Sequence, residues 1–360
     1  MSTIKLAIIG TGFFSQYHYE AWTRIPEVHP AALVYSTNAK RAAEFAKKYG
    51  ISKIFDDVES MIQIVQPDLI DIVSPPETHL PIVEMAARYK IPVITQKPLS
   101  ENFHTARQLV DVVRKNNTFA VTHENWRFKP WFREAAKLIE QGAVGDLYSV
   151  NFRMRPGDGQ GPNAYLDRQP YFQKMPRFLI HETAIHMVDV FRFLFGEVAA
   201  VTARLRRLNP VIAGEDAGIV VFDFTSGAAG IYDGNRLSDV DAENPRLTMG
   251  EMLIEGSSGQ IKLDGYGQLY VRNMGRPFRL HQYTWENRGY SGDCVYALQR
   301  HVIDHLMTGS PVENRVADYF NNLIVEQAIY QSDAEGRRIL IDGGAHVPSI
   351  KMLEEQRACI

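Results

Sequence analysis

Short apolar runs alternate with longer segments of helical composition over the first third of the chain. The apolar runs have the length and the Val, Ile and Leu content of buried parallel strands, and they lie at residues 4–9, 32–35, 69–73, 92–95 and 119–122. Helical segments separate them, at residues 13–24, 39–49, 58–65, 80–89 and 102–116. The alternation predicts a doubly wound parallel sheet with right-handed crossovers over residues 1–124.

The pattern changes after residue 125. Strand-like runs bounded by turn residues lie at residues 147–154, 199–207, 217–224, 228–234, 247–254 and 260–264. Helices are expected at residues 131–141, 178–195, 290–308 and 316–334, with a loop rich in Gly, Pro, Tyr and Gln at 156–176. We therefore predict a second, α+β domain over residues 125–360. It is built on a largely antiparallel open sheet, and its last helices could pack back on the first domain.

Length and charge narrow the class of protein. A chain of 360 residues is long enough for two domains. Its 39 Lys and Arg against 42 Asp and Glu give a formal net charge of −3, which argues against a nucleic-acid-binding protein. No run approaches the roughly 20 apolar residues of a membrane span, and the N-terminus lacks a signal-peptide pattern. Cys294 and Cys359 form neither a disulfide framework nor a metal spacing, so we expect a reduced, cytoplasmic protein.

The clearest motif is Gly10-Thr11-Gly12-Phe13-Phe14-Ser15, which follows the first strand and opens the first helix. Gly10 suits a tight turn, and Gly12 lets the backbone approach a pyrophosphate at a helix N-terminus, where free N–H groups favour an anion. At the start of a β-α-β series the motif predicts a dinucleotide site, with Phe13 and Phe14 among its contacts. The alternative is a tight turn that binds no ligand.

The end of the second strand bears on the choice of dinucleotide. An acidic residue that binds the adenosine ribose is expected about 20 residues after the glycines, but the strand ends in Tyr35-Ser36-Thr37-Asn38. The hydroxyls of Ser36 and Thr37, together with Arg41, could accommodate a 2′-phosphate. The cofactor is therefore NAD or NADP, with a lean to NADP. Alternatively, Lys40 and Arg41 are ordinary solvated helix residues.

Four further motifs follow in order along the chain. They are Ser74-Pro75-Pro76-Glu77-Thr78-His79, Gln96-Lys97-Pro98, Asn125-Trp126-Arg127-Phe128-Lys129-Pro130 and Glu182-Thr183-Ala184-Ile185-His186-Met187-Val188-Asp189. With the glycine motif, this set resembles the Gfo/Idh/MocA oxidoreductase family over nearly the whole chain. The resemblance implies an N-terminal Rossmann domain and a C-terminal domain that binds substrate. It also implies a homo-oligomer, a dimer or a tetramer.

The family consists mainly of NAD(P)-dependent dehydrogenases and reductases, which act on CH–OH groups of sugars, inositols and related polyols. Its lysine corresponds to Lys97, which is expected to touch a substrate hydroxyl and the nicotinamide ribose. Glu182 and His186 correspond to the family's aspartate and catalytic histidine. The other expected cofactor contacts are Ser74, Pro75, His79, Gln96 and Asn125, and Arg127 is an expected substrate contact.

The residue chemistry supports these roles without the resemblance. Hydride transfer to or from a nicotinamide needs a partner for the hydroxyl proton, and histidine titrates near neutral pH. On a regular helix Glu182 and His186, four residues apart, share a face. Lys97 would polarise a carbonyl oxygen and stabilise a developing alkoxide. We expect His186 as the acid/base; the alternatives are a structural histidine and a solvated loop lysine.

Two features near this helix leave alternatives open. His181 and His186 are five residues apart and diverge by about 140° on a helix, so a zinc site is not expected. The loop over residues 153–177 carries several arginines. We expect Arg155 and Tyr165 there to bind substrate, because arginines can grip a carboxylate or phosphate. The loop could equally be solvated or form a subunit contact.

The function predicted from the sequence is an NAD(P)-dependent oxidoreductase. It would transfer hydride between nicotinamide and a sugar-like polyol, inositol or keto-sugar derivative, with no nucleic-acid or membrane partner. Two alternatives belong to other classes. One is a non-catalytic regulator that senses NAD(P), and the other is a glycosidase that oxidises and restores its sugar with bound NAD.

Overall fold

The computed structural model describes residues 3–35 and 38–341, and their contacts divide them into two compact units. The first unit holds the described residues up to Lys129 together with Glu286–Asn321. The second holds Pro130–Trp285 and the described residues from Asn322 onward. The division follows from two separate sheets, one in each unit.

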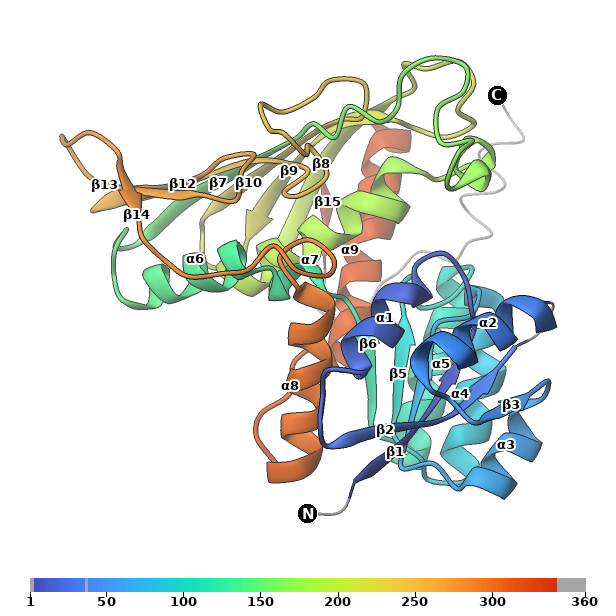
Figure 1. The fold of residues 1–360 in the computed structure, drawn as a ribbon. Coiled ribbons are helices and arrows are strands. Elements are labelled where there is room, and N and C mark those ends of the chain that lie inside the picture. The colour runs from blue at the N-terminus through green and yellow to red at the C-terminus, as the bar shows by residue number, and fades with distance from the viewer. Residues whose placement is uncertain (1–2, 36–37, 342–360) are drawn as a thin grey trace. The chain divides into compact units, whose positions relative to one another are not determined.

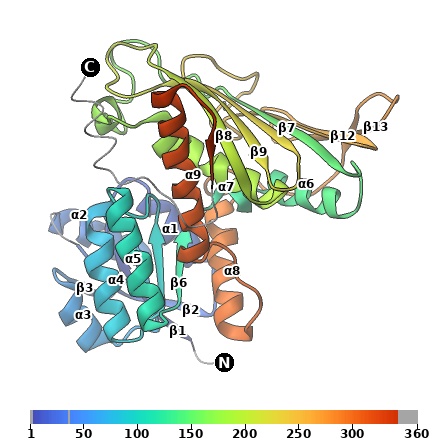
Figure 2. The ribbon, with the colours of Figure 1, turned by 180° about the vertical axis from the view of Figure 1, so that it is seen from behind.

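The first unit is built on a parallel sheet that is six-stranded within the described residues, with the order β3-β2-β1-β4-β5-β6 (Figure 1). Its strands are β1 (Ile4–Ile9), β2 (Val28–Val34), β3 (Lys53–Phe55), β4 (Leu69–Ile72), β5 (Val93–Gln96) and β6 (Ala120–His123). Its helices are α1 (Ser15–Trp22), α2 (Ala39–Tyr49), α3 (Val58–Val65), α4 (His79–Arg88), α5 (Phe103–Asn116) and α8 (Cys294–Thr308). Helices α1, α2 and α8 cover one face, and α3, α4 and α5 cover the other (Figures 1 and 2).

These elements confirm the doubly wound sheet, and local signals explain their ends. Asn38, Asp57 and Asn102 each accept a hydrogen bond from a backbone N–H in the first turn of the helix that follows. Gly50 ends α2 with a φ of 70°. The predicted strand at 32–35 was placed too late, because pairing with β1 begins at Val28. The three-residue β3 was not predicted, since Lys53–Phe55 has too few apolar residues to show a strand pattern.

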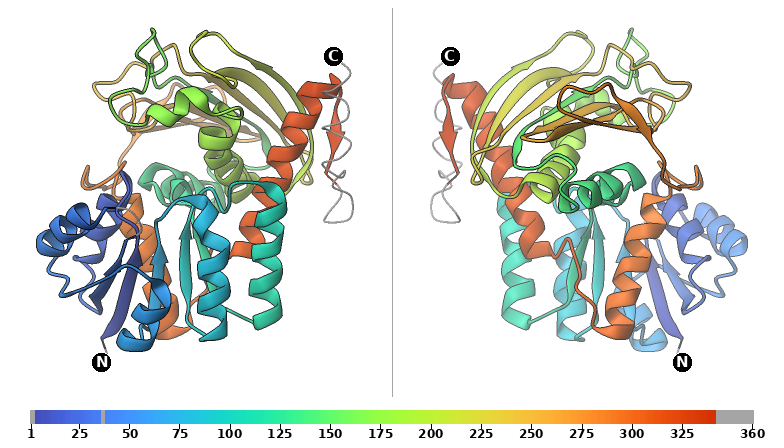
Figure 3. Two further views of the ribbon diagram at one scale, coloured as in Figure 1. Left: turned by 90° about the vertical axis from the view of Figure 1, so that its right-hand side faces the viewer. Right: turned by 90° about the vertical axis from the view of Figure 1, so that its left-hand side faces the viewer.

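The second unit is built on a mixed sheet, nine-stranded over the described residues, in the order β14-β13-β12-β11-β7-β10-β9-β8-β15 (Figure 3). The pairings are antiparallel except that of β10 with β7, which confirms the largely antiparallel sheet. The strands are β7 (Leu147–Met154), β8 (Val198–Arg206), β9 (Ala217–Phe224), β10 (Ala229–Asn235), β11 (Gly250–Gly256), β12 (Gly259–Leu263), β13 (Leu269–Asn273), β14 (Arg279–His281) and β15 (Ile339–Leu340).

Helices α6 (Pro130–Glu140) and α7 (Ile185–Phe195) belong to this unit, and α9 (Val316–Glu335) belongs to it from Asn322 onward. Helix α7 packs on the sheet through its aromatic residues. Phe191 meets Phe222 edge to face at 5.4 Å, and Phe195 lies 5.3 Å from Phe224. The strands at 269–273, 279–281 and 339–340 were not predicted. They are short and form by pairing at the two ends of the sheet.

The single helix predicted over 178–195 was wrong in one respect. Residues Leu179–Ala184 form a π-helical turn, and regular α-helix begins only at Ile185. The cause is a set of side chains that bind the backbone N–H groups of this turn, described below. Among the described residues, no helix is long and apolar enough to cross a membrane. Cys294 is a buried free thiol, and Cys359 lies outside the described residues.

Candidate functional site

The glycine turn lies at the carboxyl end of β1 and leads directly into α1. Gly10 has a φ of 113°, and a Cβ on it would come within 2.8 Å of the backbone of Val73 and Ser74. Its carbonyl oxygen accepts a hydrogen bond from the Tyr19 hydroxyl at 3.0 Å, and the Ser15 hydroxyl donates to Gly12 O at 2.7 Å. The backbone of this turn therefore has no room for a side chain at Gly10.

Helix α1 begins without a side-chain cap among the described residues. Its N-cap residue is Phe14, and its first turn contains no acidic side chain. An α-helix N-terminus that the protein leaves uncapped has N–H groups and a dipole suited to a phosphate. The turn and the helix start thus fit a dinucleotide, which Gly10, Gly12, Phe13 and Phe14 would hold. Phe13 is 41% exposed at this edge.

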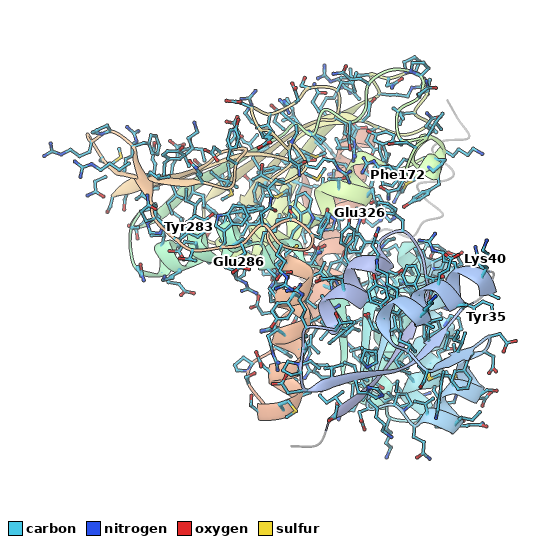
Figure 4. The ribbon with its side chains drawn as sticks, viewed as in Figure 1. Tyr35, Lys40, Phe172, Tyr283, Glu286 and Glu326 are labelled. Carbon is cyan, nitrogen blue, oxygen red and sulfur yellow. The ribbon has the colours of Figure 1, made fainter. Side chains whose placement is uncertain are left out.

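Arg41, at the start of α2, reaches back to the glycine turn. Its Nη2 donates to Gly12 O at 3.2 Å, and its guanidinium lies 5.5 Å from the centre of the Phe45 ring. Arg41 is therefore not an ordinary solvated helix residue. Lys40 beside it is exposed (Figure 4). Ser36 and Thr37, the other residues expected near a 2′-phosphate, lie outside the described residues.

His79 ties together the loops that follow β4 and β5. Its side chain is fully buried, with Nε2 3.0 Å from Ser74 O and Nδ1 3.0 Å from the Thr95 hydroxyl and 3.1 Å from Leu99 O. Burial lowers the pKa of His79, and the neutral ring donates to one of the two carbonyl oxygens, Ser74 O from Nε2 or Leu99 O from Nδ1. His79 thus fixes the loop that carries Ser74 and Pro75.

Lys97 follows the last residue of β5 and is half-buried. Its backbone N–H donates to the Gln96 side-chain oxygen at 3.0 Å, and its peptide bond to Pro98 is cis. Asn125 is buried just beyond β6, before a short 3₁₀ turn. Arg127 in that turn donates to Glu313 at 3.2 Å. In the first unit, the structure thus brings those expected cofactor residues that it describes to the carboxyl edge of one sheet, where doubly wound folds bind ligands.

In the second unit, buried side chains hold the π turn that precedes α7. The Glu215 carboxylate accepts hydrogen bonds from Phe178 N and Ile180 N, each at 3.1 Å, and from the Tyr330 hydroxyl at 2.6 Å. The same hydroxyl accepts from His181 N at 3.3 Å. These contacts satisfy N–H groups that a helix start otherwise leaves unbound. Nothing near 178 in the sequence signals them, because Glu215 and Tyr330 are distant along the chain.

The π turn carries Glu182 and His181 and leads into His186. The Nδ1 atom of His181 lies 2.8 Å from Oε1 of Glu326, a carboxylate that is 2% exposed. Glu326 lies on α9 (Figure 4). Glu182 is half-buried and His186 is 7% exposed. The regular-helix spacing assumed for Glu182 and His186 does not apply, since the turn between them is wider than an α-helical one. Among the described residues there is no cluster of histidine, cysteine and carboxylate groups that could hold a metal.

The loop before this turn is organised by Arg236, which the sequence did not single out. This arginine is 2% exposed and donates to the Tyr165 hydroxyl at 2.8 Å, to Asp158 at 2.8 Å and to Thr183 of the π turn at 2.6 Å. Burial would raise the pKa of Asp158, but the neighbouring arginines outweigh it and lower that pKa. The Tyr165 hydroxyl is therefore engaged inside the unit.

Arg155, the other expected substrate residue of this loop, is also engaged. Its Nη2 pairs with the Asp233 carboxylate at 2.5 Å, and its Nη1 donates to the carbonyl oxygens of Met154 and Asp233. These contacts join the end of β7 to β10. As substrate contacts, Arg155 and Tyr165 remain predictions.

Two family models match the chain. The model described as "Oxidoreductase family, NAD-binding Rossmann fold" matches residues 4–123, and the "GFO/IDH/MocA C-terminal domain" matches residues 132–262. The chain belongs to the Gfo/Idh/MocA family. This family fold accounts for both the glycine turn of the first unit and the mixed sheet of the second.

Individual relatives cover almost the whole chain. A D-apiose dehydrogenase from Rhizobium rhizogenes is 29% identical over 94% of this chain and 98% of its own length. A levoglucosan dehydrogenase from Pseudarthrobacter phenanthrenivorans is 25% identical over 96% of this chain and 82% of its own. The crystal structure of an oxidoreductase from Agrobacterium radiobacter, in complex with NAD⁺, L-tartaric acid and magnesium, has a TM-score of 0.85. It is 28% identical and covers 94% of this chain and 98% of its own.

Proposed function

We propose that this member of the Gfo/Idh/MocA family is an NAD(P)-dependent dehydrogenase or reductase of sugar-like polyols or their keto forms. The observation that carries the proposal is the pairing of a family NAD-binding domain with an uncapped helix after the Gly10 turn. Relatives that span nearly the whole chain are dehydrogenases of apiose and levoglucosan, and both compounds are polyhydroxylated.

The roles of the chain's own residues follow from their chemistry. A bound nicotinamide dinucleotide would supply the hydride acceptor or donor. Lys97, at the carboxyl edge of the parallel sheet, would stabilise negative charge on the reacting oxygen. His186 would hold the hydroxyl proton on its imidazole, and Glu182 would set the orientation of the substrate. Arg127 would bind a substrate hydroxyl.

The matching family domain is described as NAD-binding, which supports a nicotinamide dinucleotide. The choice between NAD and NADP is a proposal. Arg41 lies against Gly12 O, beside the pyrophosphate position, and the strand end offers no carboxylate for a ribose 2′-hydroxyl. We therefore infer that the protein accepts NADPH. Fluorescence titration with NADH and NADPH tests this: Arg41→Ala should weaken NADPH binding about tenfold more than NADH binding. Equal losses for both dinucleotides would contradict a 2′-phosphate contact.

Turnover decides the function. Purified protein is incubated with NAD⁺ or NADP⁺ and a panel of aldoses, anhydrosugars and inositols, and absorbance is read at the wavelength of the reduced nicotinamide. His186→Ala and Lys97→Ala should each reduce turnover by about 10²- to 10⁴-fold, with dinucleotide binding retained in His186→Ala. Bound dinucleotide without any turnover would favour the regulator. Sugar cleavage without net reduction of the dinucleotide would favour the glycosidase.

We also infer a homo-oligomer. Ile219, Val221 and Ile231 are 47%, 38% and 38% exposed, and Ile231 pairs with Val221 across β9 and β10. Adjacent exposed aliphatic side chains on a sheet face are typical of an interface. Light scattering with size-exclusion chromatography should give a dimer or tetramer, and Val221→Lys should shift it toward the monomer. A monomeric wild-type protein would overturn this inference.

A further inference from the structure

Glu124 is a buried carboxylate at the end of β6, in the first unit. It is 0% exposed, and its Oε1 accepts a hydrogen bond from Trp126 N at 3.1 Å. Its backbone is fixed as well, because its carbonyl oxygen accepts from the Asn314 amide at 2.6 Å. A carboxyl group buried in this way either lies near positive charge or takes up a proton.

The register of the sheet places Glu124 beside Lys97. Strands β5 and β6 are parallel neighbours, and Gln96 pairs with His123. Lys97 and Glu124 directly follow these last strand residues, so the chain leaves the sheet at the same level in both places. The residue before Lys97 is Gln96, whose uncharged amide oxygen accepts from Lys97 N. The carboxylate next to Lys97 therefore comes from the neighbouring strand.

Three basic side chains lie near Glu124. Burial raises its pKa to about 7, and the charges of Lys97, Arg127 and Lys129 oppose that rise. Lys129 is itself fully buried, which lowers its pKa to about 7. Cys294, on α8, lies near both Lys129 and Glu124. Burial raises the pKa of the Cys294 thiol to about 12, so the thiol stays neutral. Glu124 can therefore change charge near neutral pH while Lys97 stands beside it.

We propose that Glu124 is a positioning residue for Lys97. As a carboxylate it holds the Lys97 side chain at the cofactor edge. When Glu124 takes up a proton, that hold weakens and the Lys97 side chain is released from its position. The consequence for catalysis rests on the proposed function, whereas the effect on the Lys97 amine does not.

The first experiment measures the Lys97 amine without any substrate. The full-length protein is labelled with a trace of acetic anhydride at pH 7.5, and acetylation of each lysine is quantified by mass spectrometry. In Glu124→Gln, acetylation of Lys97 should rise about three- to tenfold relative to the exposed Lys137, since the Lys97 side chain loses the carboxylate that holds it and can reach the reagent more freely. Glu124→Asp, which keeps the charge, should stay near the wild-type rate. Equal Lys97 labelling in wild type and Glu124→Gln would overturn the proposal.

The second experiment measures turnover against pH. Glu124→Gln should reduce kcat about tenfold or more and remove an inflection near pH 7, while the dissociation constant for the dinucleotide stays within about twofold. Glu124→Asp should recover part of kcat. The matched control is Glu27→Gln, a partly exposed carboxylate of the same unit that pairs with Arg300 at 2.7 Å; it should leave kcat and the pH profile unchanged.

The two experiments separate the possible failures. A change in Lys97 labelling without turnover on any polyol would sink the proposed function and keep the role of Glu124. Turnover with an unchanged pH profile and unchanged labelling in Glu124→Gln would sink the role of Glu124 alone. If Glu124→Gln does not fold, as judged by circular dichroism, Glu124→Asp decides. Its shorter side chain should lower kcat while Lys97 labelling stays near the wild-type rate, and a wild-type kcat would overturn the proposal.

Discussion

Two helices carry candidate site residues, and they begin in opposite ways. Helix α1 follows the Gly10 turn with no side-chain cap among the described residues and no acidic residue in its first turn. The helical segment that leads to His186 begins with a π turn whose N–H groups bind Glu215 and Tyr330, both from distant parts of the chain.

The difference shows two uses of a helix N-terminus. An open terminus keeps its N–H groups and dipole for an anionic ligand, so its neighbourhood must contain small residues such as Gly10 and Gly12. A closed terminus gives its N–H groups to the protein's own side chains and gains rigidity. We infer that the closed turn holds Glu182 and His186 in fixed positions, as the roles proposed for these two residues require.

The largest effect is expected when a side chain is introduced into the glycine turn before α1. Gly10→Ala introduces a Cβ within 2.8 Å of the Val73 and Ser74 backbone, at a φ of 113°. We expect the free energy of unfolding to fall by about 3 kcal/mol, measured by urea denaturation, and NADH binding to be lost. A Gly10→Ala protein with wild-type stability and NADH affinity would contradict the close packing of this turn.

Gly12→Ala separates folding from ligand binding. Its nearest neighbour would be Val73 O, at 4.0 Å from the new Cβ, which is an ordinary contact. The free energy of unfolding should change by less than about 1 kcal/mol. NADH should nevertheless bind about tenfold or more weakly, because the added methyl group stands where the pyrophosphate approaches. Unchanged NADH affinity in this variant would mean that the open terminus is not the dinucleotide site.

Substitution of Glu215, which closes the π turn before α7, should mainly lower the free energy of unfolding. Glu215→Gln removes the charge from the side chain whose oxygen accepts hydrogen bonds from Phe178 N, Ile180 N and the Tyr330 hydroxyl. We expect a loss of about 2 kcal/mol in the free energy of unfolding, since hydrogen bonds to a charged group are the stronger ones. The control is Glu197→Gln, an exposed partner of Arg192, which should cost about 0.5 kcal/mol or less. Similar losses in the two variants would show that the hydrogen bonds of Glu215 contribute little to the free energy of unfolding.

The same contrast explains what the sequence could predict of the fold. Helices of the first unit were predicted to within a few residues, because Asn38, Asp57 and Gly50 are local end signals. The second unit's π turn could not be predicted, since its cause is tertiary. Glu215 lies in the loop before β9 and Tyr330 lies on α9, and their side chains bind the backbone N–H groups of this turn. Short edge strands such as β14 depend in the same way on their partners.

For the site, spacing identified the residue types but not their partners. The sequence indicated Lys97, His79 and His186 through the resemblance to the family, with the place of Lys97 at a strand end and of His186 on a helix as support. It did not indicate Arg236 or Glu124. Arg236 acts on Thr183 and Asp158, which are far from it in the chain. The position of Glu124 becomes informative only with the β5–β6 register. Buried polar groups of this kind follow from sheet pairing, which local patterns do not encode.

The smallest expected effect is on the pH dependence of the free energy of unfolding, and it comes from buried histidines. In the second unit His181 lies against the Glu326 carboxylate, whereas burial lowers the pKa of His79 and His123 in the first unit. Both first-unit rings are therefore neutral when folded, and the unfolded chain takes up protons first as pH falls. The free energy of unfolding should be constant with respect to these two groups well above about pH 6.5 and should decline as pH falls below it.

His123→Phe tests this dependence. The new ring keeps the packing against His18, whose ring centre lies 4.0 Å away, but it cannot titrate. Urea denaturation at pH 7.5 and pH 5.5 should show a smaller decline in the variant than in the wild type. His29 is exposed on β2 and serves as the control, so His29→Phe should keep the wild-type decline. If His123→Phe also keeps it, the acid sensitivity of the first unit does not come from this buried ring, and His79 becomes the group to replace next.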